Sequence, residues 1–166
     1  DNAILARGKS YVNINTSAED TVKMLGDINF NYDKVTSGSS IDAYIDVTLA
    51  GAESFWTGNT VVSYGSGKPE DESLLAVSNA KLTMKDGAVW NATKITDSKE
   101  DAKGHYYTAL NELNIDGGTV NIQDTERGIF VDEISAKGAT FNGGMLNVND
   151  AIEIVAGDTA TTFNGN

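Results

Sequence analysis

The sequence predicts an all-β fold and, within that class, a solenoid in which short parallel strands stack coil upon coil. Three observations lead to this prediction. Apolar and polar residues alternate over short stretches along the whole chain, turn residues separate these stretches, and a strand–turn–strand unit recurs at intervals. The composition agrees, because 17 Gly, one Pro and 40% hydrophobic content in 166 residues describe a folded chain with many tight turns.

The alternation has a period of two, as a strand with one buried face requires. The residue between two apolar ones is most often Asn, Asp or Thr, which predicts that the outer face of each strand is exposed to solvent. The expected strands include residues 12–14, 28–32, 45–49, 82–84, 113–115, 120–122, 146–148 and 152–154. We expect their inward residues to form one apolar column: Ile28, Phe30, Ile45, Val47, Leu49, Leu82, Met84, Leu113, Ile115, Val120, Ile122, Leu146 and Val148. Helical periodicity is nearly absent, and the best candidate, residues 71–78, is too short for more than a turn or two.

Turns are predicted at residues 36–40, 65–69, 86–87, 116–118, 137–138, 142–144 and 157–158. The repeated unit is an apolar strand, a corner with Gly and a small residue, and a second strand. It appears at residues 82–90, 113–122 and 134–141, and more loosely at 47–56. The copies start roughly 20 to 36 residues apart, the range in which one repeat makes one coil of a solenoid. An antiparallel β-sandwich built from hairpins is the alternative, since Asp86 and Gly87 could form a two-residue hairpin turn.

Charge and residue content exclude several classes of function. Twelve Lys and Arg against 24 Asp and Glu give a net charge of −12, which disfavours nucleic acid as a partner. The chain has no Cys, so no thiolate nucleophile or Cys-ligated metal is available. No run of about 18 apolar residues occurs, and we expect no direct membrane insertion of this segment.

Aromatic and ionisable residues offer few candidates for chemistry. His105 is the only histidine and has no Ser or Cys motif beside it, so it is interpreted as a solvated loop residue. Trp56 and Trp90 could be platforms for sugar stacking, but both stand at the same place in the repeat, which favours a role in filling the interior.

Carboxylates are the strongest candidates, because two or three of them on neighbouring coils could bind calcium or act as acid and base. The candidates are Asp42 with Asp46, and Asp124, Glu126, Asp132 and Glu133. Asp42 and Asp46 would face the same side of a strand, yet this spacing arises freely in an acidic β protein. We therefore assign no catalytic, cofactor-binding or metal-binding residue, and expect no cofactor.

Residues 49–58 and 84–93 resemble the Leu-x-x-Gly-Ala-x-Trp-x-x-Thr unit of bacterial autotransporter passenger domains, in the C-terminal passenger region. Residues 113–120 are similar to the strand–Gly–Gly–strand coil that follows this unit there. The resemblance spans about residues 45 to 150. It implies a right-handed parallel β-helix, a single-stranded solenoid of pectin-lyase-like type, projected from the outer membrane by a β-barrel. Two features depart from the family: these residues contain no barrel, and residues 96–107 lengthen one coil.

From this resemblance we expect residues 1–166 to form a single solenoid segment, a fragment of a longer virulence-related passenger, cell-surface or secreted. The expected function is structural and adhesive, without enzyme activity, and the loops at 33–40, 64–72 and 96–107 would contact partners. The expected partners are a host-surface glycan or protein, or a second copy. A polysaccharide lyase or hydrolase, or a tailspike-like depolymerase, on the same fold is the alternative. Because neither terminus offers an obvious cap, we expect a longer solenoid or end-to-end stacking of copies.

Overall fold

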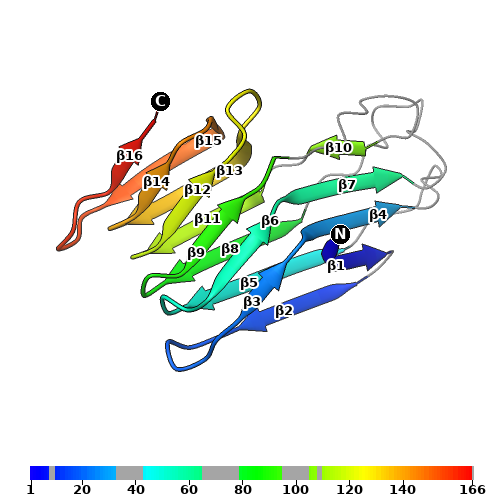
Figure 1. The fold of residues 1–166 in the computed structure, drawn as a ribbon, viewed down its shortest axis with the longest axis horizontal. Helices are drawn as coiled ribbons and strands as arrows, with labels where there is room; N and C mark the ends of the chain where they lie inside the picture. Colours follow the sequence, from blue (N-terminus) through cyan, green and yellow to red (C-terminus); the bar gives the residue numbers. More distant parts are fainter. Residues whose placement is uncertain (8–9, 33–42, 65–78, 95–104, 108–109, 166) are drawn as a thin grey trace.

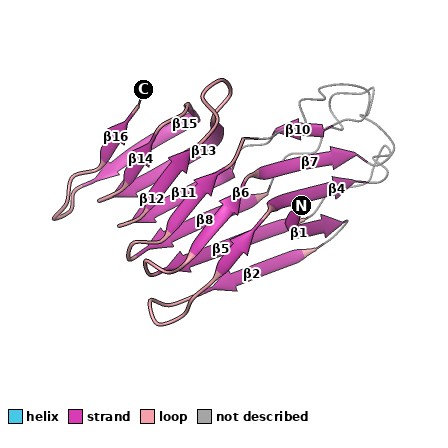
Figure 2. Cartoon of the chain, in the orientation of Figure 1, coloured by secondary structure: helices cyan, strands magenta, loops and turns pink. Residues whose placement is uncertain are grey.

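The computed structural model describes residues 1–7, 10–32, 43–64, 79–94, 105–107 and 110–165, and every regular element among them is a strand (Figure 2). The strands are β1 (Asn2–Arg7), β2 (Tyr11–Asn15), β3 (Lys23–Leu25), β4 (Asp27–Tyr32), β5 (Tyr44–Ala50), β6 (Phe55–Gly58), β7 (Thr60–Tyr64), β8 (Ala80–Lys85), β9 (Val89–Ala92), β10 (His105–Tyr107), β11 (Leu110–Asp116), β12 (Thr119–Ile122), β13 (Ile129–Lys137), β14 (Thr140–Asn142), β15 (Leu146–Val155) and β16 (Thr162–Asn164). No membrane-spanning helix is found in the part that is described. The prediction of an all-β chain is confirmed.

The strands form three sheets, which we name A (β1-β4-β7-β10), B (β15-β13-β11-β8-β5-β2) and C (β16-β14-β12-β9-β6-β3). Successive strands enter the sheets in a fixed order. The groups β1–β3, β4–β6, β7–β9 and β10–β12 each contribute one strand to A, B and C, and we call each passage a coil. The two later coils, β13–β14 and β15–β16, add strands to B and C. Figure 1 shows the coils following one another in sequence order along the molecule, an arrangement consistent with a solenoid-like fold.

Strands of neighbouring coils pair in parallel throughout the described residues, except that β10 runs antiparallel to β7. The alternative of an antiparallel β-sandwich is therefore wrong for these strands. The register also follows the sequence repeat. Leu82 pairs with Val47 on one side and Leu113 on the other, and Trp56 pairs with Trp90.

The core follows from the alternation, since the inward residues of each coil lie above those of the coil before. Eleven of the thirteen predicted core residues are buried, and Leu146 and Val148 are partly buried against them. The prediction of one apolar column is confirmed. Residues 146–148 and 152–154, expected as two strands, belong to the single strand β15.

At four of the corners between sheets B and C, residues lie in the left-handed backbone region, as at Gly138 (φ 55°) and at the pair Asp86 and Gly87. Asp86 (φ 54°) takes this conformation in its own coil, and its amide donates to the Asp116 carbonyl of the next coil. Residues 86–87 therefore join β8 of sheet B to β9 of sheet C and do not close a hairpin. The predicted turns at 116–118 and 137–138 are corners of the same kind.

Several predictions fall on residues that the structure does not describe, which are 8–9, 33–42, 65–78, 95–104, 108–109 and 166. They include Asp42, the turns at 36–40 and 65–69, and the helix candidate at 71–78. Most of each expected contact loop lies there as well.

Candidate functional site

The outer face of sheet B carries polar and charged side chains in rows. Every second residue of β8, β11 and β13 points outward, and parallel pairing places these residues in three rows along the stack. We name them the charged row (Lys81, Glu112, Glu133), the floor row (Thr83, Asn114, Ser135) and the corner row (Lys85, Asp116, Lys137). The floor row carries short side chains between two rows of longer ones, so the face is hollowed along its middle.

A hollow of about 280 Å³ lies over the floor row and the corner row. Its polar lining comes from Thr83, Asn114, Ser135, Lys85, Asp116 and Lys137, and Ile115 and Val155 complete it. We call this hollow the sheet B trough. It runs across the strands, from one coil to the next.

The polar side-chain atoms of the floor row make no hydrogen bond within the part of the chain that the structure describes. No described residue hydrogen-bonds the side chains of Thr83, Asn114 or Ser135. All three are only partly exposed, at the bottom of the trough. Two hydroxyls and one amide therefore remain available for a ligand or for solvent.

Sheet C provides a contrast, because its outer row hydrogen-bonds to itself. Asn164 Nδ2 donates to Asn142 Oδ1 (2.9 Å), and Asn142 Nδ2 donates to Asn121 Oδ1 (3.0 Å). Asn121 Nδ2 continues to Asn91 Oδ1 (2.9 Å), whose own Nδ2 reaches Thr57 Oγ1 (3.2 Å). This asparagine ladder links five coils. The amide groups of the ladder are already hydrogen-bonded to one another, whereas the side chains of the floor row are not hydrogen-bonded to any described residue.

Charges alternate along the corner row. Asp116 pairs in register with Lys85 on one side and Lys137 on the other, and all three side chains are exposed. Neither lysine makes an ion pair with any residue in the described ranges. The lining of the trough therefore carries an excess of one positive charge on a chain whose net charge is −12, and Glu133 and Glu153 lie beside it on the same face.

The charged row is partly neutralised within itself. Lys81 Nζ lies 3.0 Å from Glu112 Oε2 in the next coil. The hydrogen bond to Glu112 raises the pKa of Lys81, against a smaller opposing effect of desolvation. Asp46, one of the predicted carboxylates, occupies the same row in register with Lys81 and also favours its charged form.

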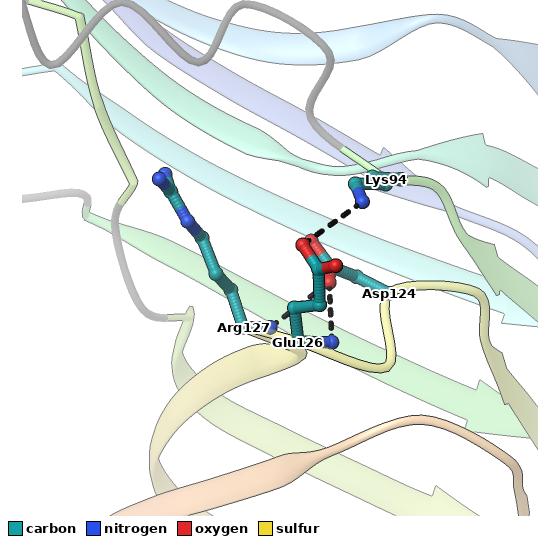
Figure 3. A network of polar contacts seen from close by, with 4 residues as sticks. All are labelled: Lys94, Asp124, Glu126 and Arg127. Carbon is teal, nitrogen blue, oxygen red and sulfur yellow. Dashed lines mark hydrogen bonds and ion pairs between the residues drawn. The ribbon is translucent and has the colours of Figure 1, made fainter.

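Asp124 is buried, and its carboxylate organises a turn (Figure 3). Its Oδ1 accepts hydrogen bonds from the backbone amides of Glu126 and Arg127, both at 2.9 Å. Burial opposes ionisation, but the amides of Arg127, Glu126 and Gly128, together with Lys94, outweigh it and hold the pKa of Asp124 below its usual range. The ionised Asp124 is a turn-forming group and is poorly suited to donate a proton.

The remaining predicted carboxylates do not meet in one site. Glu126 pairs with Lys94 (3.2 Å), as Figure 3 shows, and Asp132 Oδ1 accepts a hydrogen bond from Asn149 Nδ2 (2.9 Å). Glu133 lies on the outer face of β13 in register with Glu112. Within the described ranges, no three His, Cys, Asp or Glu residues come together as a metal site.

Two interpretations of aromatic residues are settled by position. Trp56 and Trp90 are buried, so they fill the interior as expected and offer no sugar-stacking surface. His105 begins strand β10, so its interpretation as a loop residue is wrong. The β7 strand holds β10 by antiparallel pairing, with His105 opposite Ser63.

Sequence reasoning missed the trough, because its residues belong to the strand repeat and to no recognisable ligand-binding motif. A signal was nevertheless present. Aligning the repeats at their corner residues, Asp86, Gly117 and Gly138, places the residues just before them, Lys85, Asp116 and Lys137, in one row.

Comparison with protein-family models, with curated proteins and with solved structures gives no match to this chain.

Proposed function

We propose that this chain is a non-catalytic structural and adhesive segment, folded as a right-handed, single-stranded parallel β-helix of the pectin-lyase-like type. In this proposal it belongs to an autotransporter-like protein at the bacterial cell surface or secreted from the cell. The observation that carries the proposal is the in-register stacking of all six coils in sheets B and C. Such a stack makes a rigid rod, because each coil is held by its neighbours on both sides.

Side-chain columns inside and outside the sheets support this rigidity. The Trp56 and Trp90 rings stack inside, and the exposed Phe163 ring stacks on the buried Phe141 ring (4.9 Å between ring centroids). The asparagine ladder defined above does the same on the outer face of sheet C. These columns favour one register, since a slip by one residue would reverse inward and outward faces.

Two surfaces support the adhesive part of the proposal. The sheet B trough offers unsatisfied hydroxyl, amide and ammonium groups to a glycan or a protein. Strands β15 and β16 expose Ile152, Ile154 and Phe163, which continue the interior columns of β13 and β14. Exposed apolar side chains on an edge strand favour pairing with another strand, whether of a further coil or of a second copy.

A polysaccharide-cleaving enzyme on the same fold is less well supported. Asp124 and Glu126 are engaged in a turn and an ion pair, and Asp132 accepts a hydrogen bond from Asn149. Acid–base cleavage of a glycan needs two carboxylates flanking one bond. No such pair is assembled by the candidate residues that are described.

The test combines three measurements on the purified chain. The proposal expects binding on an array of glycans and matrix proteins, or concentration-dependent association in light scattering. It also expects no release of reducing or unsaturated ends from polysaccharides, with or without calcium. Release of such ends would overturn the non-catalytic assignment, and a monomer that binds nothing would overturn the adhesive part.

A further inference from the structure

The sheet B trough has the geometry of a site for an extended polymer. Its floor groups come from successive coils, so they repeat about every 4.8 Å along the stack, the spacing of paired strands. Three successive coils each present one short neutral group, Thr83, Asn114 or Ser135, with no protein partner among the described residues, and Glu153 of the next coil follows Ser135 in the same row. A linear chain of sugars lying across the strands would offer a hydroxyl to each of these groups in turn.

The corner row adds a charge pattern with twice that period. Lys85 and Lys137 lie two coils apart, about 10 Å along the stack, and Asp116 lies between them. A polymer with a carboxylate on every unit would bring one of them against Asp116. A neutral polymer would offer no carboxylate to the two exposed ammonium groups.

Long-range electrostatics also disfavour a dense polyanion. The chain carries a net charge of −12, and the excess of one positive charge in the trough is local. A polymer that places an acidic unit beside each lysine and an uncharged unit beside Asp116 matches the charges of the corner row. It also carries fewer negative charges toward the acidic chain than a polymer with every unit acidic.

We propose that the sheet B trough binds a linear polysaccharide in which uronic-acid units alternate with uncharged sugar units, aligned with the stacking direction of the coils. The carboxylates of the ligand would pair with Lys85 and Lys137, and Asp116 would accept hydrogen bonds from hydroxyls of the unit between them. The floor row would bind the sugar hydroxyls. This proposal rests on the adhesive function proposed above and names its ligand class.

The first experiment measures binding by isothermal titration calorimetry at low salt with three oligosaccharides of equal length. They are an alternating glucuronic acid and N-acetylglucosamine chain, an oligogalacturonate with every unit acidic, and a neutral chitin oligosaccharide. We expect the alternating chain to bind tightest. Oligogalacturonate or the chitin oligosaccharide binding equally well would overturn the alternation.

Charge variants test the corner row. Lys85→Gln and Lys137→Gln should each weaken binding of the alternating chain by up to about fivefold, the scale of an exposed ion pair. Lys23→Gln is the control, because Lys23 is exposed on the outer face of sheet C. Asp116→Asn should raise the relative affinity for oligogalacturonate. Equal effects of Lys23→Gln and the trough variants would contradict the assignment.

A bulky substitution tests the trough itself. Asn114→Tyr would fill the floor and should abolish binding, whereas Thr119→Tyr makes a comparable change on the outer face of sheet C and should not. Circular dichroism of both variants checks that the strands form. If the alternating chain does not bind the native protein, this inference fails. If the protein still adheres to an array and Asn114→Tyr has no effect there, the trough fails while the proposed function stands.

Discussion

The indole rings of Trp56 and Trp90 lie one above the other in neighbouring coils, with ring centroids 5.0 Å apart and planes inclined by 2°. Each ring also donates its N–H to a glycine carbonyl of the preceding coil. Trp56 Nε1 lies 2.9 Å from Gly26 O, and Trp90 Nε1 lies 3.0 Å from Gly58 O. The polar atom of each buried indole thereby has a hydrogen-bond partner, and the two rings are held parallel to each other.

Trp90→Phe should keep an aromatic ring in the stack but remove the indole donor, while the Gly58 carbonyl keeps the Thr93 amide as a donor (3.3 Å). We expect a loss of about 0.5–1.5 kcal/mol in the free energy of unfolding, the net contribution of one hydrogen bond. Trp90→Ala should cost about 3–5 kcal/mol because it also leaves a cavity. Urea denaturation measures both. A Phe variant as stable as the native chain would show that the hydrogen bond contributes little.

Gly58→Ala should be among the most damaging small substitutions. A Cβ at this position would overlap the carbonyl oxygen of Gly26 and approach Trp56 Nε1 to 2.7 Å. The backbone would have to move, and the hydrogen bond from Trp56 would be disturbed. Gly138→Ala is the matched comparison, because its Cβ would meet nothing closer than 3.6 Å and only its φ of 55° is unfavourable.

For Gly138→Ala we expect a cost of about 1–2 kcal/mol from the left-handed backbone alone. The Gly58 variant should lose roughly 1–3 kcal/mol more than this, as overpacked sites do. Thermal and urea unfolding of the two variants give the ranking. The reverse order would contradict the close approach of these coils.

The asparagine ladder on sheet C should contribute to stability, whereas the floor row of sheet B should not. Asn121→Ala removes one hydrogen bond to Asn91 and one from Asn142, and should cost about 1–2 kcal/mol. Asn114→Ala, in the floor row of sheet B, should change the free energy of unfolding by no more than about 0.5 kcal/mol. Equal costs for the two substitutions would refute the distinction between a structural row and a row free for ligands.

Asp124 should stabilise the fold in a pH-dependent way. Its pKa is lower in the folded protein, so its contribution is present above the usual value of 3.8 and disappears as the pH falls through the folded-state pKa. Asp124→Asn should therefore lower the free energy of unfolding by about 1 kcal/mol at neutral pH, the difference between charged and neutral hydrogen bonds. The difference should narrow below pH 3.8.

Urea denaturation of the native chain and the variant at several pH values tests this. Glu126→Gln serves as a control, since its ion pair with Lys94 is exposed and should be worth at most about 1 kcal/mol. A stability difference for Asp124→Asn that does not change with pH would contradict the proposed role of the carboxylate.

Most of the fold could be predicted because the alternation is local. Ile45, Val47 and Leu49 are separated by single polar residues, and that spacing alone predicts a strand with one buried face. The corner residues then indicate that Trp56 and Trp90 share a column. Nothing local predicted the antiparallel β10, because its pairing with β7 depends on how the chain returns over residues outside both strands.

The trough could not be predicted in the same way. Thr83, Asn114 and Ser135 are ordinary solvent-facing strand residues when taken one at a time, and each is about 20 to 30 residues from the next. Their significance depends on the register between coils and on side-chain hydrogen bonds that the asparagine ladder makes and the floor row does not. The buried role of Asp124 was also hidden, because a turn-forming carboxylate and a catalytic one look alike in a sequence.

The parallel stacking of coils can be tested directly by distances between spin labels, because the chain has no Cys and labelling sites can be introduced singly. Asn15, Ser135 and Glu153 occupy one column of sheet B. Ser135 lies four strand spacings from Asn15, and Glu153 lies five from it. Pulsed electron spin resonance on Asn15→Cys/Ser135→Cys and Asn15→Cys/Glu153→Cys should give backbone separations of about 19 Å and about 24 Å. Equal separations, or a longer distance for the first pair, would contradict the stacked parallel coils.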